Sequence, residues 1–338
     1  MSALQRALQH AVEREDLPSE LMEAAIGEIM GGAASAALVG GFLAALRCKG
    51  ESVAEIAAAA RVLRRLVHPV RVARAPLLDL VGTGGDGASI FNVSTASAFV
   101  CACAGAHVAK HGNRAVSSAS GSADVLEEAG MNLDASTERV EQLIASLGVG
   151  FLFAPKHHGA MRHAAPIRRE LGIRSVFNLL GPLTNPAFAP HQVLGVYAAR
   201  WLRPLAEVMR ELGSKHVLVV HADDGLDELS LAAPTQVAEL RDGEVIQYRV
   251  APEQFGLARQ SLAPLKVENA VQSLALIRSA LGGAPGPAAD ILALNAGAGL
   301  YAADLEPSLA SGIKRAQKIL ASGDALRKLQ TVVEASWP

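Results

Sequence analysis

Cysteine is scarce in this sequence, with only Cys48, Cys101 and Cys103 among 338 residues. Three cysteines are too few for a disulfide framework, and the side chains of Cys101 and Cys103 diverge because they lie two positions apart in an apolar helical run. We therefore expect all three to be reduced core residues that bind no zinc. An excess of charge of one sign is also missing, since the net charge is −2, which gives no electrostatic footprint for nucleic acid.

Long hydrophobic runs are missing as well. Two uncharged runs that could suggest a membrane span are residues 33–46 and 90–109. The first is shorter than the ~20 residues that a membrane span needs, and polar residues interrupt the second. Residues 1–16 lack the basic-then-apolar order of a signal peptide. We therefore expect a soluble cytoplasmic protein that binds neither a membrane nor nucleic acid.

The apolar content is high, at 50% of the 338 residues, which suffices for a sizeable core and two domains. Residues 1–71 contain only helical patterns, so we expect a helical domain there, joined by helices near residues 160–180. Residues 72–338 alternate strand and helix patterns, which predicts an α/β domain with a mainly parallel central sheet. Locally, we expect Ser19 to cap the second helix and residues 181–186 to form a turn-rich loop.

Residues 79–113 carry the strongest functional signal. The apolar strand pattern of Leu77 to Val81 is followed by four glycines within six residues, and only glycine lets a backbone fold this tightly against a ligand. Asn92-Val93-Ser94-Thr95 then opens a helical run, whose free N–H groups and dipole suit an anion. A second short strand ends in Lys110. Because ligands of open α/β sheets bind beyond the strand ends, these residues predict an anion site there.

The common nucleotide motifs fit these residues poorly. A Walker loop needs Gly-Lys-Ser/Thr after its spacers, and no lysine follows these glycines. Residues 82–87 have the G-x-G-x-x-G spacing of a dinucleotide fingerprint, but no acidic residue is well placed about 20 positions further on. A tight turn without a ligand would need one glycine, and it would not explain the neighbouring Asp86 and the Asn-x-Ser-Thr sequence.

The motifs resemble those of the anthranilate phosphoribosyltransferase family. They occur in the family order along nearly the whole chain: Gly82-Thr83-Gly84-Gly85-Asp86, Asn92-Val93-Ser94-Thr95, Lys110-His111-Gly112-Asn113-Arg114, Ser117-Ser118-x-Ser120-Gly121-Ser122-Ala123-Asp124, Ala154-Pro155-Lys156-His157-His158, residues 177–186 and Gly225-Leu226-Asp227-Glu228. The chain departs from the family pattern at Ile90, where many members have threonine, and at Gly159, where many have proline. These departures affect one local contact and the stiffness of one loop.

The resemblance implies that the glycine-rich residues bind 5-phosphoribosyl 1-diphosphate (PRPP). Its phosphates need N–H donors, hydroxyls and a cation. The residues implied are Gly82, Gly85, Asp86, Asn92, Val93, Ser94, Thr95, Lys110, His111, Gly112, Asn113, Arg114, Ala115, Val116, Ser117, Ser118 and Ser122.

A diphosphate brings Mg²⁺, which keeps several waters and takes one or two carboxylates plus substrate phosphate. Asp227-Glu228 follows a strand end and fits this demand. Asp223 and Asp224 compete for the role, and adjacent acidic residues are most often a solvated turn. The resemblance implies Asp227, Glu228 and the Ser94 hydroxyl as ligands, with two Mg²⁺ ions per subunit.

The acceptor implied by the resemblance is anthranilate, whose carboxylate needs a cation. Arg168 matches the carboxylate-binding arginine of the family, and its planar fork suits a carboxylate better than lysine would. Other arginines nearby are expected to be exposed or ion-paired: Arg162, Arg169 and Arg174. The remaining acceptor residues implied are Gly82, His111, Asn113, His158 and Pro182. We expect no histidine general base, because the aniline nitrogen is hardly protonated at neutral pH.

The implied function is transfer of the phosphoribosyl group from PRPP to the amine of anthranilate, in tryptophan biosynthesis. Catalysis would rest on positioning and electrostatics, with Lys110 and Arg168 most important. Two alternatives share the fold. A pyrimidine nucleoside phosphorylase-like enzyme would need no Asp227-Glu228 metal pair, and a nucleic-acid-binding relative would carry a basic groove. The resemblance also implies a homodimer through the N-terminal helices.

Overall fold

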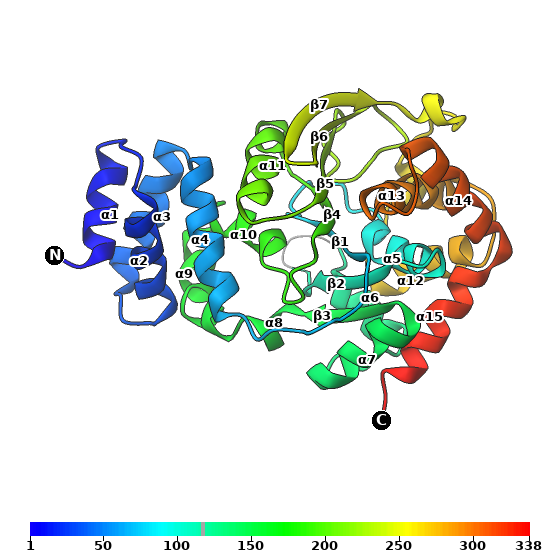
Figure 1. Cartoon of the computed structure of the whole chain (residues 1–338), viewed down its shortest axis with the longest axis horizontal. Coiled ribbons are helices and arrows are strands. Elements are labelled where there is room, and N and C mark those ends of the chain that lie inside the picture. Colours follow the sequence, from blue (N-terminus) through cyan, green and yellow to red (C-terminus); the bar gives the residue numbers. More distant parts are fainter. Residues whose placement is uncertain (116–118) are drawn as a thin grey trace.

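The computed structural model describes residues 1–115 and 119–338, and it has a small helical lobe beside a larger α/β lobe (Figure 1). The small lobe begins with four helices: α1 (Ala3–Val12), α2 (Ser19–Met30), α3 (Ala36–Lys49) and α4 (Val53–Leu66). The predicted combination of a helical bundle and an α/β domain is confirmed. None of the helices in the described residues is long and apolar enough to cross a membrane.

Serine side chains fix where three of these helices begin. Ser2, Ser35 and Ser52 each accept a hydrogen bond from the backbone N–H three residues ahead, at 3.2 to 3.3 Å. The predicted cap at Ser19 is wrong, because Ser19 is the first residue inside α2. The preceding Pro18 takes the cap position, where its carbonyl accepts the first helical hydrogen bond, from Met22 N at 3.0 Å.

The small lobe is completed by later parts of the chain. Apolar side chains of α1–α4 form one continuous core with those of α9 (Ala165–Leu171), α10 (Phe177–Leu183) and α11 (Leu202–Glu211). Arg64, near the end of α4, donates hydrogen bonds to Leu183 O at 2.7 Å and to Leu212 O at 3.2 Å. Burial lowers the pKa of Arg64 to about 10. These contacts join the helical bundle to one face of the sheet.

The large lobe is built on a seven-stranded sheet in the order β3-β2-β1-β4-β5-β6-β7. Its strands are β1 (Leu77–Gly82), β2 (His107–Gly112), β3 (Val149–Phe153), β4 (His191–Gly195), β5 (His216–Ala222), β6 (Thr235–Arg241) and β7 (Glu244–Val250). Strands β1 to β5 are parallel, β6 is antiparallel to β5, and β7 is antiparallel to β6. This confirms a mainly parallel sheet. The strand order reverses at β1, between β2 and β4, and this is where such sheets leave a ligand-binding crevice.

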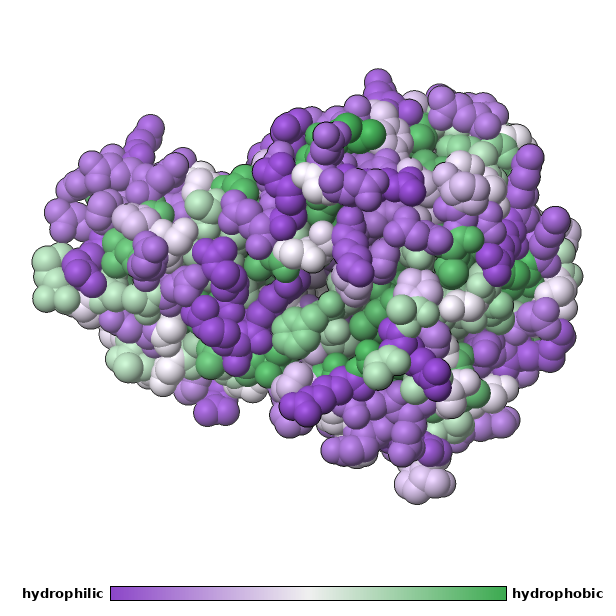
Figure 2. Space-filling view, in the orientation of Figure 1, coloured by the Kyte–Doolittle hydropathy of each residue, from purple (hydrophilic) through white to green (hydrophobic). Residues whose placement is uncertain are grey.

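Helices cover both faces of this sheet (Figure 1). One face packs against α5 (Val93–Cys103) and α13 (Pro287–Ala302), and these two helices are covered in turn by α12 (Ala270–Leu281), α14 (Leu309–Ser322) and α15 (Asp324–Ala335). The other face packs against α10 and α11, while α7 (Thr137–Leu147) lies beside β2 and β3. The short helices α6 (Ser122–Glu128) and α8 (Ala154–His157) follow β2 and β3. Hydrophilic side chains dominate the outer surface in the view of Figure 2.

The turn-rich loop predicted for residues 181–186 is wrong in its first half. Gly181, Pro182 and Leu183 form the last turn of α10. Proline is tolerated there because it removes only one helical hydrogen bond near the end. The Thr184 hydroxyl, which donates to Leu180 O and Gly181 O at 3.1 Å, then closes the helix.

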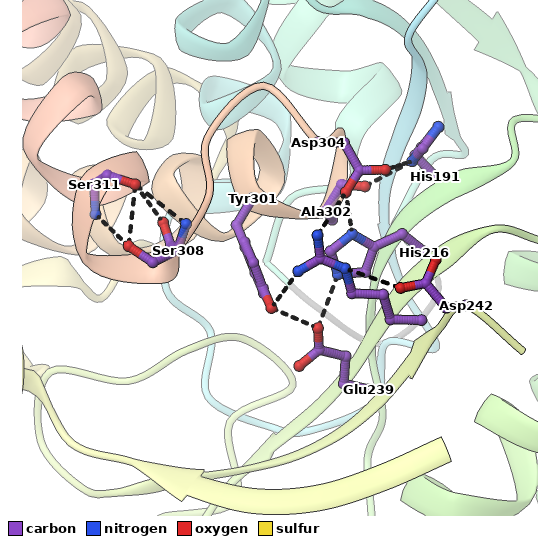
Figure 3. Close-up of polar contacts among 10 residues, drawn as sticks. His191, His216, Glu239, Asp242, Tyr301, Ala302, Asp304, Ser308 and Ser311 are labelled. Atoms are coloured by element: carbon purple, nitrogen blue, oxygen red, sulfur yellow. Dashed lines mark hydrogen bonds and ion pairs between the residues drawn. The ribbon is translucent and has the colours of Figure 1, made fainter. Parts of the chain in front are cut away.

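A polar network around the buried His216 (Figure 3) lies at the start of β4 and β5, away from the crevice. The His216 ring stands between two carboxylates, with Nδ1 2.8 Å from Asp304 Oδ1 and Nε2 3.0 Å from Glu239 Oε1. Tyr301 OH donates to the same Glu239 oxygen at 2.7 Å. Burial would raise the pKa of Glu239, but its hydrogen bonds from His216 and two tyrosines outweigh burial and lower that pKa. The network fastens α13 to the sheet, away from the crevice.

Candidate active site

The glycine loop, residues 83–89, leaves the end of β1 at the crevice. Gly84, Gly85 and Gly87 have φ values of 63°, 77° and 74°, a backbone region that residues with a side chain rarely adopt. Gly82 is paired with Gly195 at the ends of β1 and β4. A Cβ on Gly82 would lie 2.6 Å from Asp227 Oδ2, and one on Gly195 would lie 1.6 Å from Asp227 O. These two glycines therefore let the residues after β5 cross the end of the sheet.

Three carboxylates meet beside this loop. Gly84 N donates to Asp227 Oδ2 at 3.0 Å, and Asp227 N lies 3.5 Å from Asp86 Oδ2. Ser94 N, in the first turn of α5, donates to Glu228 Oε1 at 3.1 Å. Burial, reinforced by the neighbouring carboxylates, raises the pKa of Asp227 to about 7 and that of Glu228 to about 8. When ionised, this cluster is therefore short of positive charge.

Lys110 lies beneath the cluster, in β2, and is only 3% exposed. Its Nζ donates to Leu80 O at 2.6 Å and to His111 O at 3.3 Å. Burial lowers the pKa of Lys110, although the buried carboxylates around it favour its charged form. One of them, Asp79, was not predicted from the sequence. It accepts a hydrogen bond from His111 N at 3.2 Å, and burial raises its pKa to about 6.

The carboxylate cluster fits Mg²⁺ by its donor chemistry. Asp227 and Glu228 offer hard carboxylate oxygens, and together with Ser94 they line one small cavity. No group of three His, Cys, Asp or Glu side chains is arranged around one metal position in the described part of the chain. Mg²⁺ commonly takes its remaining ligands from water and substrate phosphates. The competing acids are engaged elsewhere, since Asp224 accepts from the Ser230 hydroxyl and Asp223 pairs with Arg249.

Several residues predicted for PRPP come together at the start of α5. The Asn92 side chain donates to Ser120 O at 3.0 Å and accepts from the Ser273 hydroxyl at 2.7 Å. Thr95 Oγ1 donates to Ser122 Oγ at 3.0 Å. The starts of α5 and α6 are therefore held together beside the carboxylates.

The residues that follow β2 are placed less uniformly. Gly112 is needed for close packing, because a Cβ there would lie 2.8 Å from Ser122 Cβ. The Arg114 guanidinium is turned toward Asp124 and Glu127, with which it forms ion pairs at 3.2 and 2.6 Å. The predictions for Val116, Ser117 and Ser118 lie outside the described residues.

Two predicted acceptor residues, His111 and His158, contact each other. Their Nε2 atoms are 3.1 Å apart, and the backbone of Gly181, next to Pro182, hydrogen-bonds to the His111 ring. Burial lowers the pKa of His158 to about 4 and the pKa of His111 well below its ordinary value. Both rings are therefore neutral at neutral pH, and one donates to the other.

Arg168 lies in α9, with its guanidinium 5.4 Å from the centre of the Phe177 ring. It is partly buried, and burial lowers its pKa. Among the described residues the guanidinium has no hydrogen-bond or ion-pair partner, as a site for an anionic ligand requires. Arg162 and Arg169 are exposed as expected. Arg174 is exposed too, but it reaches Gly85 in the glycine loop.

Comparisons with known proteins identify the family. The α/β domain of a glycosyl transferase family matches residues 74–326, and the helical bundle domain of such a family matches residues 5–67. The anthranilate phosphoribosyltransferase of Thioalkalivibrio sulfidiphilus is 58% identical over 330 residues, which are 98% of each chain. The crystal structure of the Thermus thermophilus enzyme of the same name is 48% identical, with a TM-score of 0.93 over 98% of this chain and 99% of that one. The Saccharomyces cerevisiae enzyme, in complex with PRPP and Mg, is 27% identical with a TM-score of 0.89 over 98% and 97%. The chain therefore belongs to the anthranilate phosphoribosyltransferase family.

Proposed function

We propose that this chain transfers the phosphoribosyl group of PRPP to the amine of anthranilate, giving N-(5-phosphoribosyl)anthranilate and diphosphate in tryptophan biosynthesis. One observation carries the proposal. In a member of this family, the crevice at the ends of β1 and β4 combines a glycine loop with a cluster of partly buried carboxylates. The first of these suits phosphate groups, and the second suits the cation that accompanies them.

PRPP would be held by the glycine loop and the start of α5. Free backbone N–H groups of the glycine loop would donate to phosphate oxygens, and the dipole of α5 favours their negative charge. Asp227, Glu228 and the Ser94 hydroxyl would hold Mg²⁺, with two ions per subunit. When bound, Mg²⁺ supplies positive charge to the diphosphate leaving group. Lys110 adds positive charge from beneath the carboxylates.

Anthranilate would bind through Arg168, whose guanidinium can form a charge-assisted hydrogen bond with the carboxylate. His111 and His158 would line the amine side of the pocket with Asn113 and Pro182. With a pKa of about 4, His158 is a weak base at neutral pH. The reaction would therefore depend on holding the amine against the ribose carbon, and on stabilising the departing diphosphate.

The assay that tests the function measures diphosphate release from PRPP, with and without anthranilate and with and without Mg²⁺. Diphosphate release should require both anthranilate and Mg²⁺. Chromatography should show that one anthranilate is consumed for each diphosphate released. Phosphorolysis of a pyrimidine nucleoside without diphosphate release would instead identify the first alternative. If neither reaction occurs and the protein binds nucleic acid, the second alternative is correct.

We also propose a cytoplasmic homodimer formed through residues 1–71, the helical domain, with residues 72–338 as the α/β domain. Val12 on α1 and Leu66 on α4 support this proposal, since they are large apolar side chains with 64% and 48% of their surface exposed. We expect a dimer mass by light scattering at micromolar concentration. A monomer mass under these conditions would contradict the proposal.

A further inference from the structure

We propose that Arg174 is a positioning residue that holds the glycine loop in the conformation that binds the diphosphate of PRPP. This inference rests on the proposed function of that loop. Arg174 lies in the link between α9 and α10, beyond the predicted acceptor residue Arg168. Its Nη2 donates a hydrogen bond to Gly85 O at 2.5 Å, across 89 positions of the chain.

The glycine loop depends on such contacts from outside. Its three glycines with positive φ belong to no helix or strand, and glycine has many accessible backbone conformations. The loop is attached at Thr83, whose N donates to Gly195 O at 2.9 Å, and at Gly84, through Asp227. Arg174 supplies the next attachment, at Gly85. Removing it leaves the middle of the loop with fewer restraints.

Arg174 is itself held in place by an aromatic platform. Its guanidinium carbon lies 4.2 Å from the centre of the Tyr197 ring, a cation–π contact. Tyr197 OH accepts a hydrogen bond from Nε1 of the buried Trp201 at 2.9 Å, which fixes the ring. Tyr197 N donates to Thr83 Oγ1 at 3.0 Å. Arg174 and Tyr197 therefore connect Gly85 to Thr83 at the start of the same loop, through three successive contacts.

The contact with Gly85 fixes the orientation of the peptide group that joins Gly85 to Asp86. A trans peptide is planar, so its C=O and N–H point in opposite directions. Because the Gly85 carbonyl is directed at Arg174, the N–H of Asp86 is directed away from it. In the described part of the chain this N–H has no acceptor, so it is available to a phosphate oxygen. The arginine would therefore act on PRPP through the orientation of the Asp86 N–H.

Arg174→Ala should raise the KM for PRPP about tenfold, because it removes a hydrogen bond from a charged donor. The KM for anthranilate, at saturating PRPP, should change by less than about twofold. Tyr197→Leu should act in the same direction, and the double variant should be no worse than Arg174→Ala, because both residues act through one contact. Arg174→Lys, which keeps the charge but loses the planar stacking, should be intermediate. Added methylguanidinium should partly restore the PRPP KM of Arg174→Ala.

Arg169→Ala is the matched control, since Arg169 is an exposed arginine of the neighbouring helix. It should leave both KM values unchanged. The wild-type protein is assayed first: a wild type without product would overturn the proposed function and the inference with it. An active wild type with a PRPP KM for Arg174→Ala within about twofold of normal would overturn the inference alone. A change in the anthranilate KM alone would overturn it too. If Arg174→Ala fails to fold, Arg174→Lys decides by the same criteria.

Discussion

Replacing Asp227 by asparagine together with Glu228 by glutamine is expected to abolish Mg²⁺-dependent turnover while leaving the fold intact. The amides have nearly the shape of the carboxylates, and their oxygens can still accept from Gly84 N and Ser94 N. They cannot supply the anionic oxygens that Mg²⁺ prefers. Diphosphate release, measured over a series of Mg²⁺ concentrations, should therefore disappear, while urea unfolding should still show a single cooperative transition.

The same variant has an expected signature in stability against pH. Burial raises the pKa of Asp227 to about 7 and that of Glu228 to about 8, so the folded protein binds these protons more tightly than the unfolded chain. Their contribution to stability is fully present below about pH 4 and is lost as the pH rises toward 8. The variant has no such loss, so its stability relative to wild type should increase between about pH 5 and pH 8. Lys110, which loses two anionic neighbours, offsets part of this gain but does not reverse the trend.

Asp223→Asn is the matched control for this pair, because Asp223 lies in the same turn but pairs with the exposed Arg249. It should keep the wild-type dependence on Mg²⁺. Unchanged turnover of the double variant at low Mg²⁺ would remove Asp227 and Glu228 from the proposed metal site. A stability difference that does not vary with pH would show that the carboxylates are not raised in pKa.

The sequence predicts local features of this fold well where a short-range cause determines them. An apolar run followed by clustered glycines predicted β1 and the loop after it, because positive φ angles select glycine. The preference for serine at the start of a helix holds for α3 and α4, whose caps are Ser35 and Ser52. It failed at Ser19, where the neighbouring Pro18 provides the first carbonyl of the helix. The turn expected at Pro182 is also wrong, because Pro182 lies in the last turn of α10, where its carbonyl accepts a hydrogen bond from Gln192 Nε2 at 2.8 Å.

The site residues missed by the sequence owe their positions to contacts between distant parts of the chain. Asp79 is a single acidic residue inside an apolar strand, a signal that could have marked a buried functional carboxylate. Arg174 carried no comparable signal, because its contact with Gly85 exists only after the α9–α10 link packs beside the crevice. Lys110→Ala is a poor probe of phosphate binding, because it would leave buried carboxylates without a cation.

Arg168→Ala is expected to raise the KM for anthranilate by about 10- to 100-fold and to leave the KM for PRPP almost unchanged. A charge-assisted contact between a guanidinium and a carboxylate is worth roughly 1.5–3 kcal/mol. Arg168 is partly buried and lacks an anionic partner among the described residues, so the substrate carboxylate would meet little competition. Steady-state kinetics with each substrate varied in turn would measure both constants.

A change of acceptor separates this contact from the packing of Arg168 on Phe177. Anthranilamide carries a neutral amide in place of the carboxylate, so it should bind wild type and Arg168→Ala with affinities within about threefold of each other. The preference for anthranilate over anthranilamide, measured by competitive binding, should therefore be lost in the variant. Arg169→Ala, one position along α9 and exposed, should keep the preference. If Arg168→Ala weakened the binding of anthranilate and of anthranilamide equally, the arginine would be a packing residue. If it weakened PRPP instead, the two substrates would be placed the other way round in the crevice.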